Sequence, residues 1–265
     1  GCCRNNLLER ADYWPRGRNN GTTTYRTASH RRFAGNKFVI TLTQTSLKRY
    51  RSEERGALIN WGLADMQLSV KKLNMSDKGL YEIDLTPYPN LEELVCEQNY
   101  LKTLDLSYTP KLVALFCDYN QISNLDLSVT PRLEYLWCSK NNLRRLDVSR
   151  LHHLRQLVCW GNLISELKLT EIPLLTELDC RNNQLMRIDL TECRLISKLH
   201  CSGNLLTELD LSNAMLLREP DYSDNSLTDL VLGEQNDLTL LRCDTNQISA
   251  VDFRDAPALN RIDYK

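Results

Sequence analysis

Apolar residues recur along most of this chain with a strict period of 21 residues. Eight consecutive units between residues 91 and 258 follow the pattern LxxLxCxxNxLxxLDLSxxPx. A weaker copy precedes them at 70–90, and a partial copy follows at 259–265. A period of this length indicates one short structural unit stacked on copies of itself. The pattern therefore predicts a solenoid over 70–265, with nine full repeats and one partial repeat.

The first half of each unit alternates apolar and polar positions over a few residues, as in LEELVC. Such alternation predicts a short β-strand. One strand per unit, stacked in register, gives a parallel sheet along one side of the coil. The predicted fold class is an α/β-type solenoid that is mostly β, with an irregular convex side and a concave parallel sheet that has one short strand per 21-residue repeat.

Cysteine and asparagine occupy fixed positions in the unit. Neighbouring strands lie about 4.8 Å apart, and equivalent side chains on parallel strands point the same way. Their Cβ atoms therefore stay beyond the usual disulfide range of about 3.5–4.5 Å. We expect buried free thiols, and asparagines that both donate and accept hydrogen bonds where the chain turns inward. The cysteine ladder comprises Cys96, Cys117, Cys138, Cys159, Cys180, Cys201 and Cys243, with Tyr222 in the missing place.

On these residues the chain resembles leucine-rich repeat proteins. The cysteine-bearing unit resembles that of internalin J-type bacterial surface proteins, and similar arrays occur in surface proteins of gut Bacteroidetes. The resemblance covers roughly residues 70–265. It implies the leucine-rich repeat fold and a role in cell-surface adhesion.

The N-terminal part has a different composition. Residues 1–35 contain little apolar sequence and are predicted to be a leader, either mobile or wrapped around a cap. Residues 36–69 contain two strand-like stretches and are predicted to form a β cap, because a solenoid must cover its exposed core. Residues 1–68 carry 12 Lys or Arg against 5 Asp or Glu, a net +7, and the remainder carries a net −8. A solvated basic leader and docking to an acidic partner both remain open.

The sequence contains no run of about 20 apolar residues, so no transmembrane segment is predicted. No secretory signal is visible. The chain starts Gly-Cys-Cys, and a lipid-bearing Cys2, as in bacterial lipoproteins, is weighed against an arbitrary starting point. The predicted location is extracellular or at the cell surface, with lipid anchoring through Cys2 left open.

Catalysis, metals and cofactors are not expected. A zinc site needs four converging ligands, whereas a column of identical side chains diverges. His200 lies beside Cys201, but adjacent residues on a strand face opposite sides. The repeated aspartates, such as Asp105 and Asp126, predict a structural role. Basic residues do not dominate the concave positions, so nucleic acid is not an expected partner.

The positions flanking the strand leucine are predicted to face solvent on the concave side. One apolar row there spans roughly 14 Å at about 4.8 Å per strand. An exposed apolar surface of this kind often marks a partner site, and Tyr and Trp are common at binding hot spots. Mutual packing, or cover by the N-terminal segment, is the alternative. The candidate ligand-binding residues are Val95, Phe116, Tyr119, Tyr135, Trp137, Val158 and Trp160.

The predicted function is a non-enzymatic recognition module that binds a protein ligand, such as a host or surface protein, through the concave face. Carbohydrate binding is the first alternative, because exposed Trp and Tyr also suit sugar faces. A purely structural spacer is the second. The sequence does not specify an oligomeric state.

Overall fold

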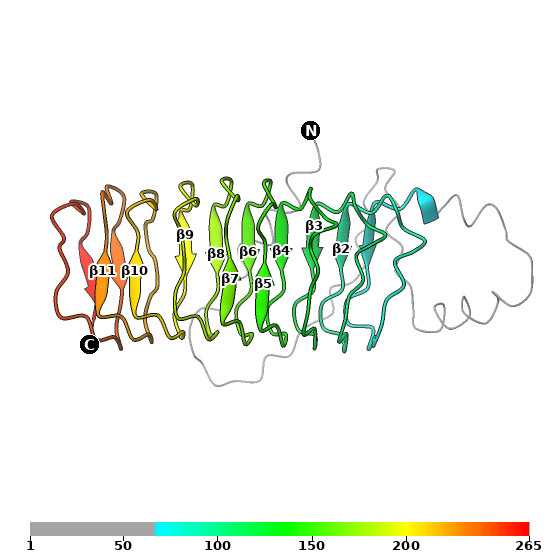
Figure 1. Ribbon diagram of the computed structural model, residues 1–265, viewed down its shortest axis with the longest axis horizontal. Helices are drawn as coiled ribbons and strands as arrows, with labels where there is room; N and C mark the ends of the chain where they lie inside the picture. The colour runs from blue at the N-terminus through cyan, green and yellow to red at the C-terminus, as the bar shows by residue number, and fades with distance from the viewer. Residues whose placement is uncertain (1–66, 265) are drawn as a thin grey trace, which may run out of the picture. The chain divides into compact units, whose positions relative to one another are not determined.

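Short parallel strands stacked at each turn of the coil define the architecture, which a computed structural model describes for residues 67–264 (Figure 1). The predictions for residues 1–35 and 36–66 lie outside the described residues. Seven strands form the main sheet in the order β1-β2-β3-β4-β6-β8-β9. They are β1 (Lys72–Asn74), β2 (Glu93–Val95), β3 (Ala114–Phe116), β4 (Tyr135–Trp137), β6 (Gln156–Val158), β8 (Glu177–Asp179) and β9 (Lys198–His200).

The register of the main sheet follows the sequence repeat. Leu73 pairs with Leu94, Leu94 with Leu115 and Leu115 with Leu136, each 21 residues further on, and all pairs are parallel. The predicted solenoid with a parallel sheet is therefore confirmed.

A second set of strands lies on the other side of the coil, where we predicted irregular structure. Here β5 (Arg145–Asp147) pairs with β7 (Glu166–Lys168), and β10 (Glu208–Asp210) pairs with β11 (Asp229–Val231). The expectation of one strand per repeat is wrong for these repeats. The LDL segment also alternates, since Leu146 is buried between the exposed Arg145 and Asp147.

The core between the two sides is made of leucines and thiols. The strand leucines and the ladder cysteines belong to one buried cluster, and the eight described cysteines are all free and buried. The predicted inward orientation of the ladder is therefore confirmed. Cys193 is also part of this core, at a position that is Leu151 and Ile172 in earlier repeats.

The repeated asparagine links each turn to the preceding one. The Nδ2 of Asn120 donates to the carbonyls of Cys96 (3.0 Å), Cys117 (3.1 Å) and Asp118 (3.3 Å), and its Oδ1 accepts from the amide of Leu101 (3.0 Å). The same pattern recurs along the column, for example at Asn99, Asn141, Asn183 and Asn246. The expected role at the inward turn is confirmed.

The repeated aspartate serves the opposite turn. The Oδ1 of Asp105 accepts from the amide of Ser107 at 3.0 Å, and Asp126 bonds Ser128 in the same way. Hydrogen bonds from the serine side chain and amide lower the pKa of Asp105 and of Asp126. These carboxylates therefore have the structural role that their repetition predicts.

The repeat at 217–237 interrupts the main sheet, and Pro220 stands there in place of the strand leucine. Pro220 has no amide hydrogen to donate to the sheet. Among the residues that the structure describes, the isolated bridges His200 to Asp221 and Asp221 to Arg242 continue the ladder there. Beyond them β12 (Leu240–Arg242) pairs with β13 (Arg261–Asp263). Tyr222 fills the cysteine position and is fully buried.

Replacing Asn120 with alanine tests the asparagine ladder. Buried backbone groups of two turns would lose their partners, so we expect Asn120→Ala to lower the free energy of unfolding by about 2–4 kcal/mol. The matched control is Asn142→Ala at an exposed side chain, with an expected change within about 0.5 kcal/mol. Urea unfolding followed by circular dichroism measures both. Equal effects of the two substitutions would contradict the assigned role.

Tyr222 offers a second test. Its hydroxyl is buried without a hydrogen-bond partner in the described part of the chain, and desolvation raises the pKa of Tyr222. Because an unsatisfied buried hydroxyl is costly, Tyr222→Phe should raise the free energy of unfolding by about 1 kcal/mol. Tyr222→Ala should lower it by about 3–5 kcal/mol through the cavity left behind. Loss of stability in the phenylalanine variant would show that the hydroxyl is bonded after all.

Candidate functional site

The main sheet brings four predicted site residues into one row. Val95 pairs with Phe116, Phe116 with Trp137, and Trp137 with Val158. None of the four belongs to the hydrophobic core cluster, because alternation along each strand turns them away from the buried leucine. We call these four residues the apolar row, and the side of the main sheet that carries them the main-sheet face.

The apolar row is less exposed than we predicted. The exposed fraction is 4% for Val95, 2% for Phe116 and 9% for Val158, and Trp137 is half-buried. The expectation of solvent-facing side chains is therefore wrong for Val95, Phe116 and Val158. Side chains at equivalent positions on adjacent strands are about 4.8 Å apart. The rings of Phe116 and Trp137 meet edge to face, with centroids 5.2 Å apart and planes at 87°.

Mutual packing within the row is thus confirmed for Phe116 and Trp137. The other alternative, cover by the N-terminal segment, concerns residues outside those the structure describes. A binding role for the row stays a prediction.

The three remaining predicted residues border the row. Tyr135 and Trp160 are half-buried, and Tyr119 keeps 50% of its surface exposed. The rings of Tyr119 and Trp160 meet edge to face at 6.1 Å and 84°. Lys140 places its Nζ 4.7 Å from the centre of the Trp160 ring. Sequence reasoning missed Lys140, although it occupies the position of Tyr119 one repeat later.

Two polar groups beside the apolar row have no hydrogen-bond partner in the part of the chain that the structure describes. They are the buried indole Nε1 of Trp137 and the buried hydroxyl of Ser139. The amide of Ser139 is satisfied by Asp118 Oδ1. An indole nitrogen can only donate, so a buried donor is left unpaired next to the apolar row. The residue types alone did not indicate these two unpaired groups, because burial and hydrogen bonding depend on the packed structure.

Charged residues continue the main-sheet face beyond the row. Asp179 is fully buried and accepts two hydrogen bonds from Arg181, at 2.9 and 2.8 Å. Burial raises the pKa of Glu177, and the nearby Lys198 opposes this shift. Burial also lowers the pKa of His200. This part of the face is a network of paired charges.

The described residues offer little reactive chemistry. Burial raises the pKa of every ladder thiol, and it raises that of Cys193 to about 12, which suppresses the thiolate needed for nucleophilic attack. Cys201 faces the core, whereas His200 lies on the main-sheet face, so the two side chains do not meet. Among the residues described, no group of three His, Cys, Asp or Glu could hold a metal ion.

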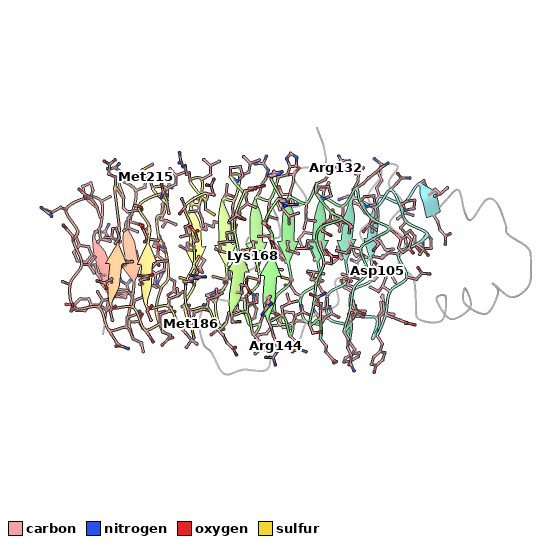
Figure 2. All side chains as sticks on the ribbon, in the orientation of Figure 1. Asp105, Arg132, Arg144, Lys168, Met186 and Met215 are labelled. Atoms are coloured by element: carbon pink, nitrogen blue, oxygen red, sulfur yellow. The ribbon has the colours of Figure 1, made fainter. Side chains whose placement is uncertain are left out.

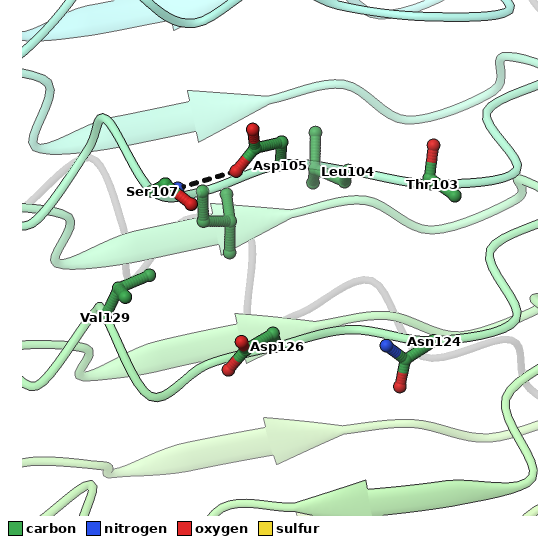
Figure 3. A pocket seen from close by; sticks show the side chains of 8 residues that line it. Thr103, Leu104, Asp105, Ser107, Asn124, Asp126 and Val129 are labelled. Carbon is green, nitrogen blue, oxygen red and sulfur yellow. Dashed lines mark hydrogen bonds between the residues drawn. The ribbon is translucent and has the colours of Figure 1, made fainter.

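A shallow hollow lies on the opposite side of the coil, between two consecutive repeats (Figure 3). Asp105 and Asp126 line it together with Leu104 and Val129. The Asp105 carboxylate is already bonded to Ser107. In Figure 2 this face carries Asp105 and Lys168 among many separate polar side chains. It has no aromatic cluster comparable with the main-sheet face among the residues described.

The described part of the chain also contains no helix that is long and apolar enough to cross a membrane.

Several solved structures are similar to this chain. The functional domain of InlJ from Listeria monocytogenes, which includes a cysteine ladder, is 26% identical over 77% of this chain and 60% of that one, with a TM-score of 0.44. The internalin InlF from Listeria monocytogenes is 20% identical over 77% and 63%, with a TM-score of 0.62. The leucine-rich repeat domain of APL1B is 22% identical over 85% and 73%, with a TM-score of 0.64.

The chain spans 60% and 63% of the two Listeria chains. No protein-family model matches the sequence, and no curated protein does. The similarity to InlF and to APL1B concerns the fold, in agreement with the 21-residue turns and the parallel main sheet. The chain therefore has the leucine-rich repeat fold, and internalins are among the proteins that share it.

Proposed function

We propose that the chain is a non-enzymatic recognition module that binds a protein through its main-sheet face. The observation that carries this proposal is the apolar row with its unsatisfied donors. Four apolar residues stand side by side outside the core. The Trp137 indole nitrogen and the Ser139 hydroxyl beside them lack partners within the described residues. A protein partner contacts the part of Trp137 that stays exposed and the half-exposed aromatic side chains that border the row.

The residue types at the edge of the row support a protein interface. Tyr119, Tyr135, Trp137 and Trp160 all retain exposed surface. Tyr and Trp combine a large apolar area with a polar group, and they are enriched among the residues that dominate binding energy. Beyond the row, the ion pair of Asp179 with Arg181 is already internally satisfied. The partner is therefore expected to centre on the aromatic half of the face.

The resemblance to internalins supports a location at the cell surface, and adhesion to a host or surface protein as the role. Lipid anchoring would depend on Cys2, which lies outside the described residues.

Carbohydrate binding is the second candidate, because of one pair of side chains. Tyr81 and Tyr100 are both exposed and stack with their centroids 5.2 Å apart and their planes at 23°. The outer ring face of an exposed, stacked aromatic pair suits a sugar ring. This pair lies at the first repeats, outside the apolar row, so the two functions can be separated by substitution.

Panning a phage library of surface-protein fragments against the immobilised chain tests the main proposal. Enriched fragments are then measured by biolayer interferometry against variants. Trp137→Ala and Tyr135→Ala should each weaken binding by about tenfold or more, which corresponds to about 1.4 kcal/mol. The matched control is Met186→Ala, because Met186 is 66% exposed and lies at a turn edge of the coil (Figure 2).

Loss of binding in the Met186 variant, with full binding in the two face variants, would contradict the proposal. Binding of wild type and Trp137→Ala to the same sugars on a glycan array, abolished by Tyr100→Ala, would instead favour the carbohydrate function.

A further inference from the structure

One edge of the main-sheet face carries the aromatic rings of Tyr119 and Trp160, which we call the aromatic corner. The ammonium of Lys140 already lies against the Trp160 ring. Tyr119, Lys140 and Gly161 occupy the same position in three consecutive repeats, with φ angles of 55°, 54° and 67°. Trp160 directly precedes Gly161. The amide of Tyr119 donates to Ser139 and that of Lys140 donates to Trp160, both at 2.9 Å. The backbone beneath the corner is therefore fixed by inter-repeat hydrogen bonds.

The two rings form the walls of the corner. Their centroids are 6.1 Å apart and their planes are nearly perpendicular, at 84°. The ammonium of Lys140 lies 4.7 Å from the centre of the Trp160 ring, within the distance of about 6 Å at which a cation is attracted to an aromatic face.

The missing side chain at position 161 leaves room for this lysine. A Cβ added to Gly161 would lie 3.0 Å from the Cδ of Lys140 and 3.1 Å from its Cε. The lysine stem thus runs alongside the glycine backbone toward the Trp160 ring. Lys140 is exposed, and it forms no salt bridge with any other residue that the structure describes.

We propose that this corner, formed by Tyr119 and Trp160, is a binding site for an arginine side chain of a protein partner, which displaces Lys140. The proposal rests on the main-sheet face being a protein interface. A guanidinium is planar, stacks on aromatic rings and is more weakly hydrated than an ammonium. It therefore competes well with the internal lysine. The repeat region carries a net charge of −8 over residues 69–265, which favours a basic partner.

Lys140 acts in this arrangement as an internal competitor. A ligand that must displace an occupant binds with an affinity reduced by the fraction of sites that are free. Removing the lysine side chain should therefore strengthen binding, which a residue with a merely structural role would not do. Replacing Lys140 with arginine should weaken binding, because a stronger competitor then fills the corner.

The test uses the blocked peptide Ac-Gly-Arg-Gly-NH2 as the probe. The full chain is labelled with ¹⁵N, and the indole N–H signal of Trp160 is assigned by its loss in Trp160→Phe. Titration should shift this signal in wild type. In Lys140→Ala the half-saturation concentration should fall about threefold. It should rise in Lys140→Arg and in Tyr119→Leu. The same peptide with neutral citrulline in place of arginine is the control.

Two results would overturn the proposal. One is an equal shift with the citrulline peptide, which would show that the charge is not recognised. The other is weaker binding by Lys140→Ala than by wild type, with unchanged circular dichroism, which would make the lysine a contributor rather than a competitor. Neither result bears on the wider protein-binding role, which depends on Trp137 and Tyr135.

Discussion

The side-chain amide of the repeated asparagine makes a 21-residue turn possible. Where the coil turns inward, backbone carbonyls and amides point into a space lined by leucine and cysteine, and buried backbone groups need partners. Asn120 supplies these partners to residues of its own turn and of the preceding turn at once. The straight stacking of the strands depends on this arrangement.

Once the turns are stacked in this way, the main-sheet face becomes a fixed array. Each outward position of one strand lies beside the same position of the next, so a few adjacent substitutions create a continuous surface. Val95, Phe116, Trp137 and Val158 form such a surface, and the aromatic corner at Trp160 adjoins it. The later repeats use the same positions for ion pairs such as Asp179 with Arg181. The apolar repeats can therefore serve recognition, while the later repeats with their ion pairs keep the same scaffold soluble.

The sequence was sufficient to predict the solenoid, the parallel sheet and the inward orientation of Cys117 and Cys138, because all three follow from a strict period and from alternation. It also predicted which residues share the apolar row. It did not predict that Phe116 is almost completely buried, because burial on the outer side of a sheet depends on how neighbouring side chains pack. The donors left unpaired at Trp137 and Ser139, and the lysine over Trp160, depend on side-chain conformations that a repeat pattern does not specify.

The proline at position 220 has a further consequence for how the molecule responds to a mechanical force along its length. The stability of a solenoid is close to a sum over its repeats and over the contacts between neighbours. The two junctions between β9 and β12 have bridges instead of continuous strands in the main sheet, so the main sheet contributes less there than at the junctions before them. When the ends are pulled apart, separation should begin there, which leaves the aromatic repeats intact while the terminal turns yield.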